Sequence, residues 1–231
     1  MGDCVIITMF HKFSFSYHER EIDSETMKSE KLVKLFAYLL SHYQRTVPSS
    51  ELVDVLWYLD DVDNPIGALK NLIYRLRTLL KKEFGLTDFI ITGKGSYSIN
   101  PNYHLQIDTV IFEKYEALLK TSQKPEYYEH LLESYTGKYL MEIKEDHSVL
   151  SKRVYYHSLF MDKTIEYAML LEEQKENMKK WKELLVKLSL LIILRNLFMK
   201  FLFVLYTSRN NIKKQKTHIK QQQIYFIRHW V

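Results

Sequence analysis

The side chains best suited to a chemical role lie in one basic stretch, from Asn64 to Lys82, which holds five cations and no carboxylate. At about 100° per residue, its outer side carries Asn71, Tyr74, Thr78 and Lys81, with Lys70 and Arg77 on one flank and Arg75 and Lys82 on the other. Cationic and amide groups in such a row can bind phosphate oxygens and the edges of nucleic-acid bases. The chemistry expected here is non-covalent binding of a polyanion.

The same stretch predicts the helix that positions these groups. Asn64 can cap the first turn, and Pro65 has its φ already set for a helix. Apolar residues recur at helical spacing and form one core-facing stripe: Leu69, Leu72, Ile73, Leu76 and Leu80. One interpretation is a helix that docks on its own domain and offers its other face to DNA; the alternative is an ordinary amphipathic helix with a solvated basic face. The stretch alone favours the alternative, so its neighbours decide.

Two helices are predicted before the basic stretch. One covers residues 29–43 with Ser29 as its cap, and the other begins at Ser49 or Ser50. The second helix and the basic stretch, joined by a short acidic loop at residues 60–63, make a helix-turn-helix.

Short strands are predicted on both sides of these helices. Residues 5–22 predict two antiparallel strands. After Gly85, a C-cap, residues 89–92 and 97–99 predict a β-hairpin with Lys94 at its tip. Such a tip can reach a phosphate or the minor groove beside a helix in the major groove; the alternative is a surface turn with an incidental lysine. A phosphate-binding P-loop is excluded, because glycine rather than Ser or Thr follows Lys94.

These parts, in this order, resemble an OmpR-type winged-helix domain, and more narrowly that of SARP-like bacterial transcriptional regulators. The resemblance covers residues 5–100 and rests on the run at Tyr74–Leu80 and on Ile91–Ile99. It implies that the third helix enters the major groove. It implies further that Asn71, Tyr74, Arg75 and Thr78 face the groove, Lys70 and Arg77 face phosphates, and Lys94 is the wing contact. The chain departs from relatives in carrying Tyr74 and Thr78 where they often carry more charge.

A break at residues 100–102 separates a second, helical region. A helix is expected near Gln106 with Asp108 as its cap, and a long one from about Ser148 to Gln174. The pattern predicts helical hairpins of the tetratricopeptide-like kind, without a clean 34-residue period. The order of these segments is similar to the bacterial transcriptional activation domain of SARP-like proteins. This similarity implies contacts with RNA polymerase, a second subunit or other protein domains.

The composition changes abruptly after residue 185. Residues 188–206 are almost all Leu, Ile, Phe and Val, but Arg195 and Lys200 weaken a transmembrane interpretation. A cationic helix on a membrane surface is a second interpretation. We favour a third, translation outside the ancestral reading frame, because Ala, Gly, Asp and Glu are all absent after Glu183.

The charge balance means that DNA binding by this chain must depend on local basic patches rather than on its net charge. The net charge is +5, but nine of the 33 Lys and Arg residues follow residue 185, so the first 185 residues hold 24 cations against all 28 acidic residues. A single cysteine, Cys4, fits a reducing cytoplasm and no disulfide. The nine histidines lack metal-binding spacing, and no nucleophile motif is present, so we expect no metal, no cofactor and no enzyme activity.

The sequence therefore predicts an α+β winged helix-turn-helix domain over residues 1–103 and an all-α tetratricopeptide-like module over 104–185, which we expect to be truncated. Residues 186–231 form the atypical tail. The expected function is sequence-specific binding of double-stranded DNA by a cytoplasmic transcription regulator, as a homodimer on repeated half-sites. The predicted DNA contacts are Lys70, Asn71, Tyr74, Arg75, Arg77, Thr78, Lys81 and Lys94. The alternative is a protein-interaction adaptor whose winged helix does not bind DNA.

Overall fold

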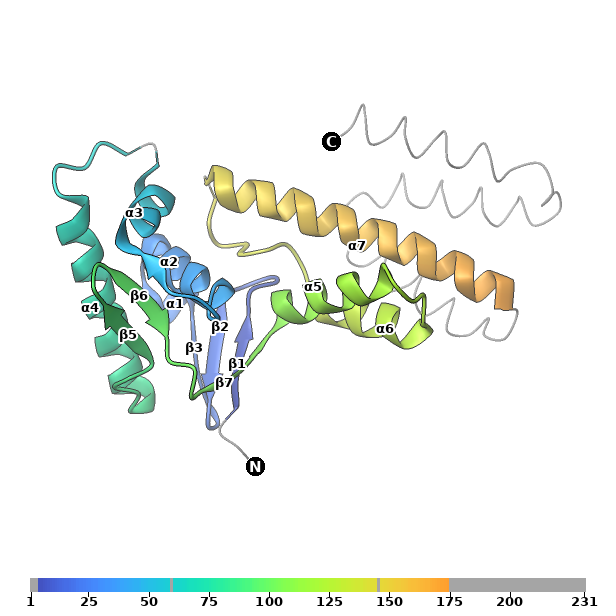
Figure 1. Cartoon of the computed structure of the whole chain (residues 1–231), viewed down its shortest axis with the longest axis horizontal. Coiled ribbons are helices and arrows are strands. Elements are labelled where there is room, and N and C mark those ends of the chain that lie inside the picture. Colours follow the sequence, from blue (N-terminus) through green and yellow to red (C-terminus); the bar gives the residue numbers. More distant parts are fainter. Residues whose placement is uncertain (1–3, 59, 145, 175–231) are drawn as a thin grey trace. The chain divides into compact units, whose positions relative to one another are not determined.

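The computed structural model describes residues 4–58, 60–144 and 146–174 (Figure 1). The predictions for the tail at 186–231 lie outside these residues. The elements are β1 (Cys4–Thr8), β2 (Ser14–Tyr17), β3 (Arg20–Asp23), α1 (Ser24–Met27), α2 (Glu30–Ser41), β4 (Val47–Pro48), α3 (Ser49–Trp57), α4 (Pro65–Phe84), β5 (Ile90–Gly93), β6 (Ser96–Ile99), β7 (His104–Ile107), α5 (Asp108–Leu119), α6 (Pro125–Ser134) and α7 (His147–Gln174). Residues up to Glu173 belong to one compact unit.

The N-terminal sheet has the strand order β3-β2-β1-β7. Neighbouring strands are antiparallel from β3 to β1, whereas β1 and β7 are parallel. The prediction of two strands was wrong, because His18 and Glu19 adopt positive φ angles of 46° and 47° and turn the chain back into β3. The predicted domain boundary at residue 103 falls before β7, and β7 carries the sheet on to Ile107.

Aromatic packing joins this sheet to the helices that follow it. Phe15 of β2 packs against Phe36 of α2 and Phe89, with ring centroids 5.2 and 5.3 Å apart. These three side chains are almost fully buried. The Phe15–Phe89 pair is edge-to-face, with an interplanar angle of 86°, and such a pair contributes about 0.5–1.5 kcal/mol beyond the area it buries. The predicted helices at 29–43 and from 49 are both present, as α2 and α3.

Two helix starts differ in how they are capped. The Ser29 hydroxyl accepts the Leu32 amide at 3.3 Å, as predicted. The predicted serine cap of α3 was wrong, since the capping position is Pro48 and has no side-chain cap. The Ser49 amide donates instead to the Gly95 carbonyl at 2.9 Å. The start of α3 is therefore satisfied by the β5–β6 hairpin.

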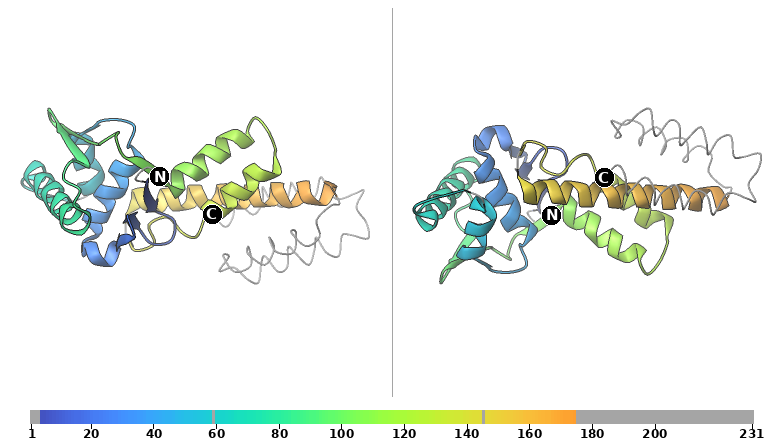
Figure 2. Two further views of the ribbon diagram at one scale, coloured as in Figure 1. Left: turned by 90° about the horizontal axis from the view of Figure 1, so that it is seen from below. Right: turned by 90° about the horizontal axis from the view of Figure 1, so that it is seen from above.

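Helices α5 and α6 pack side by side and α7 lies along them, as Figure 2 shows from two sides. Tyr128 of α6 stacks on Tyr167 of α7 at 5.1 Å with an interplanar angle of 6°. The predicted long helix from Ser148 to Gln174 is present as α7. Within the described residues, the module consists of one helix pair followed by one long helix.

The segment between β1 and β2 is inserted into the helical module. Phe10, which is fully buried, packs against Phe112, Tyr135 and Tyr156 at 5.6, 4.8 and 5.1 Å. The backbone pairs as well, because the Leu140 amide donates to the Met9 carbonyl and the His11 amide to the Lys138 carbonyl, both at 2.8 Å. The sheet and the helices therefore share one core.

Asp108 fixes the same junction through its carboxylate. Its oxygens accept the Met9 amide at 2.9 and 2.8 Å, the Phe10 amide at 2.8 Å and the Thr109 amide at 2.7 Å. The predicted cap role was wrong in its position, because Ile107 is the capping residue and Asp108 begins α5. Burial raises the pKa of Asp108 to about 7, and the backbone N–H donors oppose this rise.

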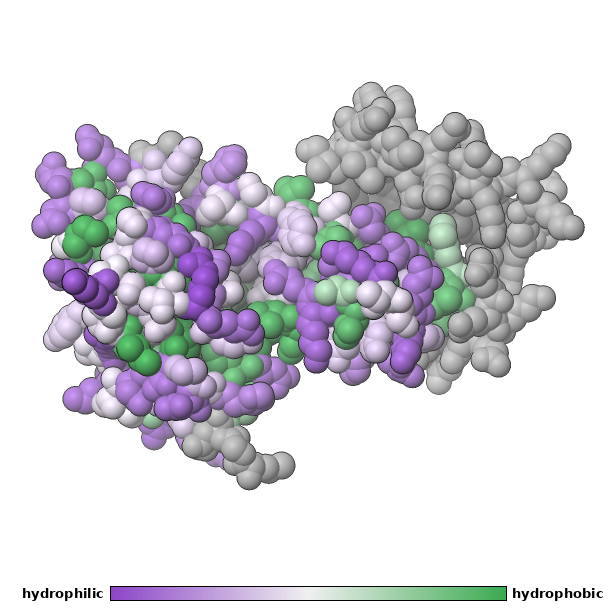
Figure 3. All heavy atoms as spheres, viewed as in Figure 1, coloured by the Kyte–Doolittle hydropathy of each residue, from purple (hydrophilic) through white to green (hydrophobic). Residues whose placement is uncertain are grey.

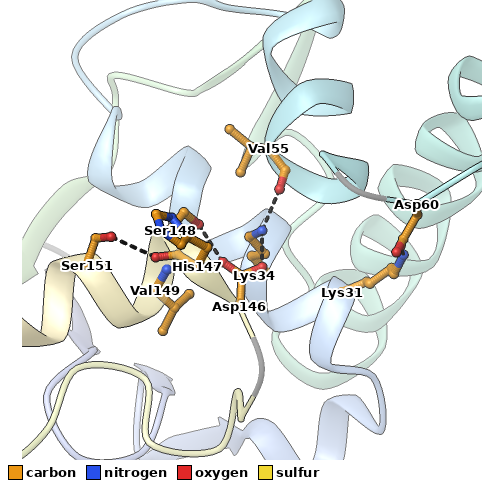
Figure 4. A network of polar contacts seen from close by, with 9 residues as sticks. All are labelled: Lys31, Lys34, Val55, Asp60, Asp146, His147, Ser148, Val149 and Ser151. Carbon is orange, nitrogen blue, oxygen red and sulfur yellow. Dashed lines mark hydrogen bonds and ion pairs between the residues drawn. The ribbon is translucent and has the colours of Figure 1, made fainter.

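Charged side chains add contacts between the sheet region and the helical module. Lys34 of α2 donates to the Val55 carbonyl of α3 and pairs with Asp146, which caps the start of α7 through the Val149 amide at 3.0 Å (Figure 4). Within the helical module itself, Arg153 of α7 donates to the carbonyls of Tyr139, Leu140 and Ile143.

The titration of Asp108 predicts a pH dependence of stability. A carboxyl whose pKa is near 7 when folded and 3.8 when unfolded binds its proton more tightly in the folded state. The free energy of unfolding should therefore fall as pH rises from about 4 to 7, by up to about 4 kcal/mol for this group. In Asp108→Asn this contribution is absent. Chemical denaturation of both proteins across this range measures it, and a wild type that gains stability relative to the variant would contradict it.

Candidate nucleic-acid interface

The helix α4 forms as its sequence predicts. The Asn64 side chain accepts the Gly67 amide at 2.9 Å, and Gly85 ends the helix with a φ of 74° while its amide donates to carbonyls of the last turn. The predicted apolar stripe is buried: Leu69, Leu72, Ile73, Leu76 and Leu80. The opposite face of α4 is consequently left to solvent.

Six of the eight predicted contact residues lie exposed on α4: Lys70, Asn71, Tyr74, Arg75, Thr78 and Lys81. Tyr74 is 71% exposed, which is unusual for so large a ring. The Thr78 hydroxyl donates to the Tyr74 carbonyl at 2.8 Å, which leaves its oxygen as an acceptor. Among the described residues, none forms a hydrogen bond or ion pair with the side chains of Lys70, Asn71, Arg75 or Lys81, so these groups can engage a ligand without first breaking a bond.

Arg77 is placed differently from its neighbours on α4. Its side chain is half-buried, and Nη2 donates to the Ile90 carbonyl and to the Thr92 hydroxyl, both at 2.7 Å. Both acceptors belong to β5. Arg77 therefore joins α4 to the hairpin rather than extending freely from the helix.

The hairpin presents the eighth residue, Lys94. In the β5–β6 register Gly93 faces Ser96, so Lys94 and Gly95 form the turn, and Lys94 is exposed. Gly95 has a φ of 71°, a left-handed conformation that favours glycine. β6 also pairs with β4, which makes a three-stranded sheet of order β4-β6-β5. The predicted hairpin with a lysine tip is confirmed.

α4 and the β5–β6 hairpin lie side by side (Figure 1), and Arg77 bonds the helix to the hairpin. The acidic loop before α4 is partly neutralised, because Asp60 pairs with Lys31 of α2 (Figure 4). Lys82 is paired with Glu83 at 2.8 Å. On the face seen in Figure 3, hydrophobic residues form small patches among hydrophilic ones. The arrangement is suited to polar contacts with an anionic surface.

The part of the chain that the structure describes contains neither a metal site nor a membrane-spanning helix. No group of three His, Cys, Asp or Glu side chains is placed to hold a metal ion there. No described helix is both long and apolar enough to cross a membrane.

Comparison with known proteins gives a likeness in fold. No family model matches the chain, and no curated protein matches it. A solved structure of Mycobacterium tuberculosis EmbR, in complex with a low affinity phosphopeptide, is similar with a TM-score of 0.52 and 15% sequence identity. The similarity covers 80% of this chain and 53% of EmbR, so this chain spans about half of that structure. An α+β N-terminal part followed by helices is common to both.

Sequence reasoning missed the residues that hold the hairpin in place. Thr92 accepts from Arg77, and the Ser49 amide holds the Gly95 carbonyl. A helical projection of α4 gives the direction of Arg77 but contains no information on β5, which pairs with it only in the folded chain. The one available signal was the order of the elements, with a helix followed directly by a hairpin.

The left-handed conformation of Gly95 predicts that a substitution there lowers stability through backbone strain alone. A Cβ at this position meets no atom within 4 Å, so Gly95→Ala should act only through backbone strain. We expect it to lower the free energy of unfolding by about 1–2 kcal/mol. Gly95→Asn, which tolerates the left-handed region better, should cost less and serves as the matched control. Equal stability of Gly95→Ala and wild type in thermal unfolding would contradict the conformation described.

Proposed function

We propose that the chain is a SARP-like transcription regulator that binds specific double-stranded DNA sequences through a winged helix. The observation that carries the proposal is the row of exposed, unengaged polar side chains on α4, next to a hairpin with Lys94 at its tip. The likeness in fold to EmbR supports the same architecture. α4 has 20 residues, a length of about 30 Å, and a helix fits the major groove of B-DNA.

Each exposed group has a role that its chemistry supports. Asn71 and Arg75 can form paired hydrogen bonds with adenine and guanine edges, and Tyr74 is exposed on the outer side of α4 with Asn71. Thr78 offers a hydroxyl oxygen to the groove. Lys70, Lys81 and Lys94 serve as phosphate contacts, as the exposed position of each permits. Such phosphate contacts position the helix, whereas the base contacts give specificity.

In this proposal the helical module α5–α7 is a tetratricopeptide-like activation module that contacts RNA polymerase or other protein domains. The regulator acts in the cytoplasm, without catalysis, as a homodimer on repeated half-sites. The helical module shares a core, centred on Phe10, with the N-terminal sheet. A partner that moves the module would therefore move the DNA-binding part with it.

The second candidate function is a protein-interaction adaptor that does not bind DNA. It is favoured by the charge of the first 185 residues, where 28 acidic residues exceed 24 cations. A surface of this kind repels a polyanion except at local basic patches.

A salt titration of the full chain with duplex DNA separates the two functions. Displacement of counterions from several phosphates makes affinity fall linearly on a log–log plot, with a slope of about 0.9 for each phosphate neutralised. Three contacts from Lys70, Lys81 and Lys94 predict a slope of roughly −3 for each protomer. A slope near zero, or no binding at low salt, would reject the DNA-binding function in favour of the adaptor.

Arg75 provides the test of specificity. We expect Arg75→Ala to weaken binding to a duplex selected by the wild type by about 1–3 kcal/mol, with a smaller effect on unrelated duplexes. Lys114→Ala on α5, where the cation is also exposed, removes the same charge and should leave affinity nearly unchanged. Equal losses for the two variants would show that Arg75 contributes net charge and no base contact.

A further inference from the structure

We propose that Arg77 is a positioning residue, which holds the β5–β6 hairpin against α4 so that Lys94 reaches the DNA backbone while α4 lies in the groove. This inference rests on the proposed DNA-binding function. It replaces the phosphate contact that the sequence predicted for Arg77 with a role that acts through Lys94.

The guanidinium of Arg77 faces β5 through Nη2. Nη2 has two hydrogens, and its two acceptors, the Ile90 carbonyl and the Thr92 hydroxyl, each lie 2.7 Å away. Nε is shielded from solvent and has no hydrogen-bond partner within the described residues. The two Nη2 donors of Arg77 are thus directed toward β5, and a phosphate contact through Nη2 would require breaking these bonds.

The bonds from Arg77 hold the strand that leads into the turn at Lys94. Lys94 lies two residues after Thr92 and directly before Gly95, whose carbonyl accepts the Ser49 amide at 2.9 Å. One side of the turn is therefore attached to α4 and the other to the start of α3. The two helices of the helix-turn-helix together fix where the tip stands.

The β5–β6 hairpin needs such attachments. Its strands have four residues each, and a hairpin of this size is marginally stable by itself in water. The long side chain of Lys94 adds further freedom, so any mobility of its backbone would raise the entropy cost of ordering it on DNA. Arg77 removes part of that cost before binding occurs.

A double-mutant cycle on the full chain tests this role. Arg77→Met keeps the apolar stem and removes the donors, whereas Thr92→Val removes one acceptor and leaves the charge of Arg77 in place. Each is combined with Lys94→Ala, and affinity for a selected duplex is measured across a salt series. Thr87→Val, at another exposed threonine ahead of β5, is the matched control and should have no effect.

We expect Arg77→Met and Thr92→Val each to weaken binding roughly two- to fivefold. This is the range for loss of one exposed ion pair, here the contact between Lys94 and a phosphate. Each should also reduce the salt slope by up to about 0.9, as Lys94→Ala does by itself. In the Lys94→Ala background neither should cause a further loss in affinity or slope, because the residue through which they act is already gone.

Other results would overturn the proposal. A full additional loss from Arg77→Met in the Lys94→Ala background, with a further fall in slope, would make Arg77 a phosphate contact while leaving the DNA-binding function intact. An unchanged affinity for Thr92→Val would show that the hydroxyl bond is not used, and this variant carries the test if Arg77→Met fails to fold. A wild type that binds no duplex would reject the proposed function itself, and the positioning role with it.

Discussion

The insertion of Phe10 into the helical module is the contact on which the rest of the described structure depends. Its ring packs against side chains from α5, α7 and the segment between α6 and α7, and the backbone on either side pairs with residues 138–141. Removal of a fully buried phenylalanine typically costs about 3–5 kcal/mol. The carboxylate of Asp108 adds three backbone amides to the same junction. Sheet and helices consequently fold as one compact unit.

This junction gives the candidate interface a rigid support. α4 is held to the core by its apolar stripe, and the hairpin is held to α3 and α4 by Ser49 and Arg77. Lys34 extends the connection from α2 and α3 to the start of α7. Preorganisation of this kind lowers the entropy cost of ordering a binding surface. It also gives a physical path between the helical module and the proposed DNA contacts.

The sequence was sufficient to predict those elements whose formation depends on residues close together in the chain. Apolar periodicity and the caps at Asn64 and Gly85 defined α4, and the turn at Lys94–Gly95 defined the hairpin. The exposed face of α4 followed from the same periodicity. Local signals also misled, since Pro48 rather than a serine occupies the capping position of α3, and the Ser49 amide donates to the Gly95 carbonyl.

Contacts between distant residues could not be predicted in this way. Asp108 is bonded to an amide 99 residues before it, and β7 pairs with β1, a strand that α1 to α4 separate from it in the chain. A projection of α4 assigned Arg77 to the exposed flank, because it could not include the two acceptors on β5. In each of these cases a partner distant in sequence decides the role of the residue.

Selection of duplexes from a random pool by the full chain tests the central claim most directly. The account predicts enrichment of a repeated motif, with half-sites about 10–11 base pairs apart or at a multiple of this spacing, if two protomers each place α4 in the major groove on one side of the DNA. Sequences recovered at the frequencies of the starting pool would contradict the claim that α4 reads DNA.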